Sequence, residues 1–208
     1  MRTFMDDHEY KRAIGLIDYY RFDNLSLRYA DFIKLPIDQY EKMMSLLYKK
    51  GKPLVEILSY VLMPNHFHFT LKQEIDGGIA KFVGNFENSF TRYINIKNDR
   101  PGPLFQGRFK AVLIESDEQL IHLTRYHHLN PFADGVVSNF QELVNYPYSS
   151  LGDYLGHHRD KFVDTEMVLS FFSDSNAYKK FVAKQKDYQR SLSKIKKLLY
   201  PAWGKSCA

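Results

Sequence analysis

The spacing of apolar residues divides the chain into helical stretches and one strand-like stretch. Capping patterns, such as Asp6 with Glu9 three residues later, mark where helices begin, and glycine and proline mark where they end. Helices are predicted from about Asp7 to Tyr20, between Pro36 and Gly51, from the Gly77-Gly78 break through Tyr93, from about Asp117 to Asn130, near Thr165 to Phe172, and from about Asn176 to Leu199. The fourth should end before Pro131, which cannot donate to a helix and disfavours helical geometry in the preceding residue.

From Val55 to Lys72 the period changes to two, with a turn at Met63-Pro64-Asn65, so this stretch predicts two strands in a hairpin. In the second strand, His66, His68, Thr70 and Lys72 share one face, and Phe67, Phe69 and Leu71 share the other. The phenylalanine face is predicted to be core. So are the apolar positions of the second helix, Ile37, Tyr40, Met44 and Leu47. A further strand is predicted from Arg108 to Ile114.

Composition supports one folded α+β domain with an extension. The chain has 208 residues, of which 44% are hydrophobic and 25% charged. It has no apolar run long enough to span a bilayer and no signal-peptide pattern at its N-terminus, so we expect a cytoplasmic protein without a membrane partner. The lone Cys207 excludes an internal disulfide and a cysteine-based zinc site.

Positive charge is concentrated near the C-terminus. Residues 179–197 hold eight basic side chains and one acid, a net of +7, so the rest of the chain sums to −2. Such a segment suits a polyanion such as nucleic acid, although a solvated helix would show the same pattern.

The His66-Phe67-His68 sequence places two imidazoles on one strand face, with Cα atoms ~7 Å apart. That spacing suits one metal ion. Because two histidines do not complete a catalytic site, a further protein ligand and open positions for substrate are required. A pair of ordinary surface histidines is the alternative interpretation.

The fourth helix places His122, Tyr126 and Asn130 at i, i+4 and i+8, so they should line one face and could project toward a common point. Asn130 offers a neutral oxygen ligand. Tyr126 offers a phenol, which with a reference pKa of ~10 is a poor nucleophile at neutral pH without a nearby metal or cation. From the spacing alone, the simplest interpretation of Tyr126 is an aromatic side chain packed against the sheet.

Three separated motifs resemble the REP-associated tyrosine transposases, which belong to the single-tyrosine HUH transposases. The motifs are Leu62-Met63-Pro64-Asn65-His66-Phe67-His68, Leu104-Phe105-Gln106-Gly107-Arg108-Phe109-Lys110 and Arg125-Tyr126-His127-His128-Leu129-Asn130-Pro131. Tyr148-Ser149-Ser150 with Asp153-Tyr154 extends the match, which covers roughly residues 7–156 in consistent order. We therefore expect a transposase-like domain over residues 1–156 and a basic helical extension over residues 157–208.

The resemblance implies a ferredoxin-like antiparallel sheet packed on helices, and a single-stranded DNA endonuclease and strand transferase. His66, His68 and Asn130 would hold Mg²⁺ or Mn²⁺, and Tyr126 would attack a phosphodiester to leave a 5′-phosphotyrosine and a free 3′-hydroxyl. No nucleotide cofactor is implied. The partner would be single-stranded DNA, with hairpin ends, and the protein a monomer or homodimer.

Basic residues near the motifs and in the extension are the expected DNA contacts, and ordinary surface salt-bridging is their alternative role. They are Arg108, Lys110, Arg125, Lys179, Lys180, Lys184 and Arg190. The remaining histidines, His127, His128, His157 and His158, are interpreted as structural.

One departure from the family is the missing first strand, because members usually begin with a strand beside the one that bears the histidines. Its absence would leave ladder groups unsatisfied, so we expect an N-terminal truncation. Two alternatives stay open: a non-catalytic, single-strand nucleic-acid binder of the same fold, and a metal-dependent hydrolase in which water attacks.

Overall fold

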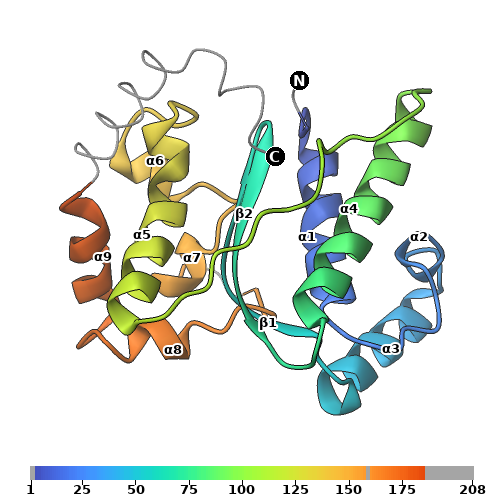
Figure 1. Ribbon diagram of the computed structural model, residues 1–208, viewed down its shortest axis with the longest axis horizontal. Helices are drawn as coiled ribbons and strands as arrows, with labels where there is room; N and C mark the ends of the chain where they lie inside the picture. Colours follow the sequence, from blue (N-terminus) through green and yellow to red (C-terminus); the bar gives the residue numbers. More distant parts are fainter. Residues whose placement is uncertain (1–2, 158–159, 186–208) are drawn as a thin grey trace. The chain divides into compact units, whose positions relative to one another are not determined.

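The computed structural model describes residues 3–157 and 160–185. The chain forms two compact units, with mixed α/β structure (Figure 1). The hairpin unit contains residues 3–5, Ile57–Leu71 and the described residues from Gln106 onward. The helical unit contains Asp6–Glu56 and Lys72–Phe105. No helix in the described ranges is both long and apolar enough to cross a membrane.

A β-hairpin, β1 (Val55–Met63) and β2 (His66–Gln73), is the only sheet formed by the described residues. Pro64 and Asn65 make its turn, as predicted, and the tight turn makes the two strands antiparallel. Most of both strands belongs to the hairpin unit. The phenylalanine face of β2 is only partly buried, so the prediction that it forms core holds in part.

The helices of the hairpin unit follow the hairpin in the sequence. They are α5 (Asp117–Ala133), α6 (Phe140–Val144), α7 (Leu151–Tyr154), α8 (Glu166–Leu169) and α9 (Ser175–Ala183). Side chains from β1, α5, α7, α8 and α9 share one apolar core, which includes Leu58, Leu129, Tyr154, Val168 and Tyr178. This core thus contains residues on both sides of position 156, after which the extension was expected to begin. The rest of the predicted C-terminal helix, beyond residue 185, lies outside the described residues.

Backbone groups on the outer edge of β1 form hydrogen bonds with side chains and with a short segment, not with a full strand. Tyr146 and Tyr154 donate their hydroxyl protons to the carbonyls of Leu62 and Leu58, at 2.8 and 2.6 Å. The Leu62 amide donates to the Tyr148 carbonyl at 2.8 Å. Residues 146–154 thus supply hydrogen-bond partners along this edge.

The outer edge of β2 pairs with no strand among residues 3–157 and 160–185. Residues 3–5 do not form one, since the amides of Thr3 and Phe4 both donate to the Pro64 carbonyl at the hairpin turn. The described structure is thus a two-stranded sheet with helices.

Two other predictions for this unit are wrong. Residues 108–114 contain no strand, and Val112 and Leu113 are 80% and 77% exposed. The apolar alternation there has no neighbouring strand to pair with. α5 continues past Asn130 to Ala133, because Pro131 falls in the last turn, where one missing donor is tolerated and its carbonyl accepts from Val136 and Val137.

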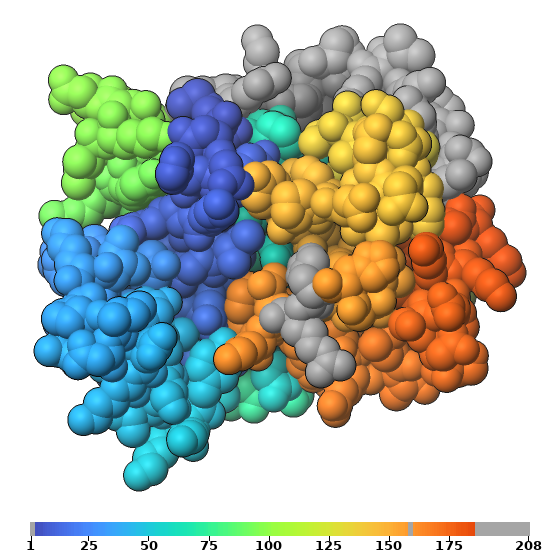
Figure 2. All heavy atoms as spheres, turned by 180° about the vertical axis from the view of Figure 1, so that it is seen from behind, coloured from blue at the N-terminus to red at the C-terminus, as the bar shows by residue number. Residues whose placement is uncertain are grey.

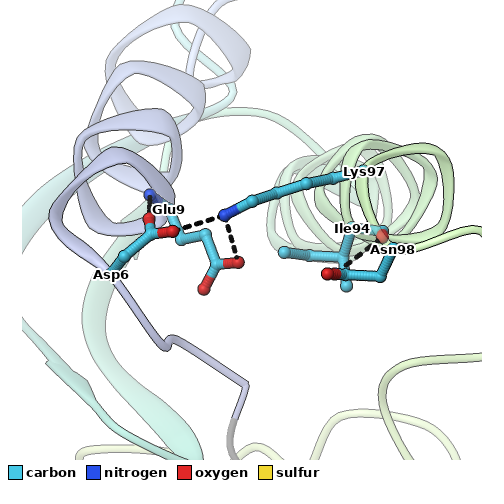
Figure 3. Close-up of polar contacts among 5 residues, drawn as sticks. All are labelled: Asp6, Glu9, Ile94, Lys97 and Asn98. Atoms are coloured by element: carbon cyan, nitrogen blue, oxygen red, sulfur yellow. Dashed lines mark hydrogen bonds and ion pairs between the residues drawn. The ribbon is translucent and has the colours of Figure 1, made fainter.

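The helical unit contains α1 (Asp7–Tyr20), α2 (Tyr29–Phe32), α3 (Ile37–Lys50) and α4 (Gly78–Lys97). The predicted bounds of α1 are confirmed, since Asp6 caps it by accepting from the Glu9 amide at 2.9 Å. α1 packs on α4, where Lys97 bonds the carboxylates of Asp6 and Glu9 (Figure 3). The apolar stripe of α4 is buried.

α3 forms where predicted but buries none of its residues, so the prediction that its apolar positions are core is wrong. Ile37 is 70% exposed, and the light blue region that includes α3 lies at the surface (Figure 2). The helix is attached through two rings, Tyr40 against Phe32 and Tyr48 against Phe22. The spacing of its apolar residues correctly predicted an amphipathic helix, but that spacing does not show whether another element covers the apolar face.

Candidate active site

The two histidines of β2 lie side by side in the hairpin unit. The ring centroids of His66 and His68 are 4.9 Å apart, and the rings are inclined at 79°. Nδ1 of His66 lies 2.8 Å from Oδ1 of Asn65 in the turn. Because an amide oxygen only accepts, Nδ1 carries the proton and Nε2 keeps its lone pair in the neutral ring. The turn therefore orients His66 as a possible metal ligand.

His68 is held in its neutral form. Burial, together with a smaller effect of the neighbouring His66, lowers its pKa to about 4, and Asp134 partly opposes this shift. At neutral pH the ring therefore offers a lone pair without first losing a proton, as a metal ligand must.

Tyr126 projects from α5 beside His68. The ring centroids are 6.0 Å apart, and the rings meet edge to face at 70°. Tyr126 is also 39% exposed, so a large substrate can reach it. Ser116 fixes the start of α5 by accepting from the Gln119 amide at 3.2 Å, and Gln119 accepts from the Glu115 amide at 2.9 Å. This local capping sets the helical register that places Tyr126.

A buried polar triangle joins α5 to both strands. Ser59 of β1 donates to Thr70 of β2 at 2.9 Å, and both hydroxyl oxygens lie 3.1 Å from Nδ1 of His127. The His127 ring stacks on His68 with centroids 5.2 Å apart. Burial lowers the pKa of His127 well below its ordinary value, and the histidines His68 and His128 add to this effect. His127 therefore positions α5 and Tyr126 against the histidine strand.

Sequence reasoning gave His127 only a general structural role. The available signals were Thr70 on the same strand face as His66 and His68, and a second histidine directly after Tyr126. The triangle itself depends on contacts between residues 57 and 68 positions apart, which spacing does not reveal.

Asn130 lies one helical turn after Tyr126 and is buried. Its Nδ2 has no hydrogen-bond partner among the described residues, an unusual state for a buried amide. The described residues contain no group of three or more His, Cys, Asp or Glu side chains suited to a metal. The candidate donor set is thus the two imidazoles of β2, which lie side by side, and the amide of Asn130 on α5. Such a set would leave a divalent ion open positions for substrate oxygens.

His122 and Arg125 do not join this site. Arg125 is 7% exposed and lies over the Phe181 ring at 4.1 Å, and its Nη2 is 2.5 Å from Nδ1 of His122. The guanidinium of Arg125 therefore packs on Phe181 and contacts His122, and burial lowers its pKa. The face expected from the i, i+4, i+8 spacing is therefore occupied only by Tyr126 and Asn130.

The other predicted DNA contacts lie at the surface or outside the described residues. Arg108 and Lys110 are exposed in the irregular segment before α5. Lys180 and Lys184 are exposed on and just after α9, and Lys179 is partly buried. Arg190 and His158 lie outside the described ranges. Comparison of the chain with protein-family models, curated proteins and solved structures found no match.

Proposed function

We propose that this chain is a metal-dependent single-strand DNA nicking and joining enzyme of the tyrosine transposase type, with a ferredoxin-like parent fold. The observation that carries the proposal is the placement of an accessible tyrosine, Tyr126, edge to face with His68, the neutral partner of His66. The two motifs that resemble the family supply these residues from β2 and α5.

In the proposed reaction, the Tyr126 oxygen attacks a backbone phosphorus of single-stranded DNA. A bond forms between this oxygen and phosphorus, the bond from phosphorus to the 3′-oxygen breaks, and the leaving oxygen takes up a proton. The phenolic proton leaves to water, which can reach the exposed ring. The 5′-phosphotyrosine retains the energy of the ester bond, so attack by a 3′-hydroxyl can rejoin DNA.

His66, His68 and Asn130 would hold the metal. A divalent ion such as Mg²⁺ or Mn²⁺, when bound, would polarise the phosphate and offset its developing charge. The His127 triangle would keep Tyr126 in place while DNA binds, because attack requires reacting atoms within ~3–3.5 Å. Arg108, Lys110, Lys180 and Lys184 remain the proposed backbone contacts.

The test is incubation of the protein with labelled single-stranded hairpin oligonucleotides and Mn²⁺, followed by a denaturing gel. We expect a covalent adduct that disappears in Tyr126→Phe and falls at least ~100-fold in His66→Ala and His68→Ala. Tyr148→Phe, in the same unit, is the matched control and should keep the adduct. DNA affinity should be little changed in Tyr126→Phe, because the ring is retained.

Two results would contradict the proposal. Cleavage without an adduct would point to attack by water. Saturable DNA binding without cleavage, unaffected by either histidine substitution, would point to a non-catalytic binder.

A further inference from the structure

A cavity of about 800 Å³ is formed by residues of the helical unit, and none of its lining residues belongs to the candidate active site. Its walls are α1, the segment from Tyr20 to Lys34, and α4. The volume is within the range of small-molecule sites, about 300–1,000 Å³. All of these elements belong to the helical unit.

α4 lines the cavity with one polar stripe. Its members are Lys81, Asn85, Asn88, Ser89 and Arg92. Their spacing of four, three, one and three residues puts them on one side of the helix. Phe82, Phe86 and Phe90 occupy another side and are fully buried. Because these rings fix the rotation of α4, the polar stripe is held toward the cavity.

The lining is cationic. It contains six basic side chains and two acidic ones, Asp23 and Asp31. Lys81 pairs with Asp23, Lys34 lies 3.9 Å from Asp31, and Lys97 is bound to the acids of α1. Three arginines remain: Arg12, Arg28 and Arg92. In residues 3–157 and 160–185 none of them has an ion-pair partner.

Arg12 is held in place by aromatic rings. Its guanidinium carbon lies 4.6 Å from the centroid of Tyr29 and 5.1 Å from that of Tyr93. Gly15 makes room for this arrangement, since a Cβ there would lie 1.8 Å from the Tyr29 hydroxyl oxygen. The buried Nε of Arg12 has no hydrogen-bond partner in the described part of the chain. A fixed guanidinium with an unpaired buried donor is suited to an incoming anion.

The rest of the lining suits a planar polar group. Asn85, Asn88 and Ser89 offer amide and hydroxyl donors and acceptors, which can pair with the edge of a nucleobase. Tyr20, Phe22 and Tyr93 offer aromatic surface at the same cavity. A phosphate alone would use only the arginines and leave most of the volume unfilled.

We propose that this cavity binds a nucleotide, with its phosphate on the arginines and its base on the amide stripe of α4. A free mononucleotide and one nucleotide of a DNA strand share this chemistry. The site is independent of Tyr126 chemistry and goes beyond the nicking reaction.

The test is calorimetric titration of the full chain with 5′-dAMP, deoxyadenosine, inorganic phosphate and a 5′-phosphorylated tetranucleotide. We expect saturable binding of 5′-dAMP, and binding at least about tenfold weaker for deoxyadenosine and for phosphate, since each lacks one half of the contacts. Arg92→Gln and Arg28→Gln should each weaken 5′-dAMP binding about tenfold. Both positions are exposed, so the variants should fold. Lys42→Gln on α3, outside the cavity, is the matched control.

Titration with the tetranucleotide distinguishes a nucleotide in a DNA strand from a free mononucleotide as the ligand. Tighter binding of the tetranucleotide than of 5′-dAMP would identify a DNA strand, and equal or weaker binding a free nucleotide. Tyr126→Phe should bind 5′-dAMP as the unmodified chain does, so failure of the nicking proposal would leave this result intact. The proposal is overturned if neither 5′-dAMP nor the tetranucleotide binds saturably, or if the arginine variants behave like Lys42→Gln.

Discussion

α4 and α5 are both long helices with polar side chains, but these side chains face a cavity on α4 and are buried in the protein on α5. On α4 the polar stripe faces a cavity and contains cations and amides, while the opposite stripe is aromatic and buried. On α5 the polar residues Thr124, Arg125, His127, His128 and Asn130 are themselves buried. A polar group inside the protein requires a hydrogen-bond partner, whereas one in a cavity can be left for a ligand.

The difference matches the chemistry proposed for each helix. α5 contributes His127 and His128, whose burial and internal hydrogen bonds keep both rings neutral and fixed, so the helix holds Tyr126 beside the histidines of β2. The site on α4 needs positive charge that is not neutralised by the protein's own carboxylates. A long helix thus has a different role in each unit: the buried polar groups of α5 fix the position of Tyr126, whereas the polar stripe of α4 faces a cavity.

The largest expected effect comes from the aromatic stripe of α4. Phe86 is fully buried and lies parallel to the Phe90 ring, with centroids 6.2 Å apart. Phe86→Ala should lower the free energy of unfolding by about 3–5 kcal/mol, because it removes buried apolar contacts and leaves a cavity. Urea denaturation would measure this change. Asn88→Ala on the polar stripe is the control and should change the free energy of unfolding by less than ~0.5 kcal/mol. Equal losses in the two variants would show that the aromatic stripe of α4 does not stabilise the protein more than its polar stripe.

The second prediction concerns the loss of stability at low pH that results from the buried His128 of α5. Nδ1 and Nε2 of His128 lie 2.7 Å from the Tyr178 hydroxyl and 2.9 Å from Oγ of Ser150, and burial lowers the pKa of His128 to about 3. The unfolded chain takes up this proton near pH ~6.5, so it binds more protons than the folded chain between the two pKa values. Stability should therefore fall as pH drops below ~6.5, by about 2 kcal/mol at pH 5 from His128 alone.

Denaturation of the unmodified chain and of His128→Gln at pH 7 and pH 5 would check this prediction. His128→Gln should lose about 2 kcal/mol less than the unmodified chain over this interval, whatever its stability at pH 7. His8→Gln, at an exposed position, should keep the full loss. The same slope in all three proteins would mean that His128 is not protected from protonation.

The sequence predicted secondary structure correctly where the structure depends only on residues within a few positions of one another. The Asp6 cap, the Ser116 cap and the turn at Pro64-Asn65 each act within a few residues, so the bounds of α1, the start of α5 and the hairpin could be predicted. The strand expected over residues 108–114 and the burial expected for α3 failed, because a strand needs a neighbour and a core position needs a covering surface.

The same distinction applies to the candidate site. The strand period placed His66 and His68 on one face, and the three-motif resemblance linked them to Tyr126, which the structure brings beside His68. His127 and its bonds to Ser59 and Thr70 could not be predicted, since they join three elements distant in the sequence. The packing of Arg125 on the Phe181 ring could not be predicted for the same reason.

The smallest expected effect concerns Lys97, a cation near the end of α4 that pairs with the protein's own carboxylates. Nζ of Lys97 lies 2.8 Å from Oε1 of Glu9, whose side chain is 0% exposed, and bonding to Asp6 and then Glu9 raises the pKa of Lys97 (Figure 3). Lys97→Met keeps the aliphatic stem but removes this donor, so the free energy of unfolding should fall by about 1 kcal/mol, limited by the solvent around Lys97 and Asp6. Lys11→Met, which breaks an exposed pair with Asp7, is the control and should cost less than ~0.5 kcal/mol in urea denaturation. If both variants lost the same amount, burial of Glu9 would not make its ion pair with Lys97 any stronger than the exposed pair of Lys11 and Asp7.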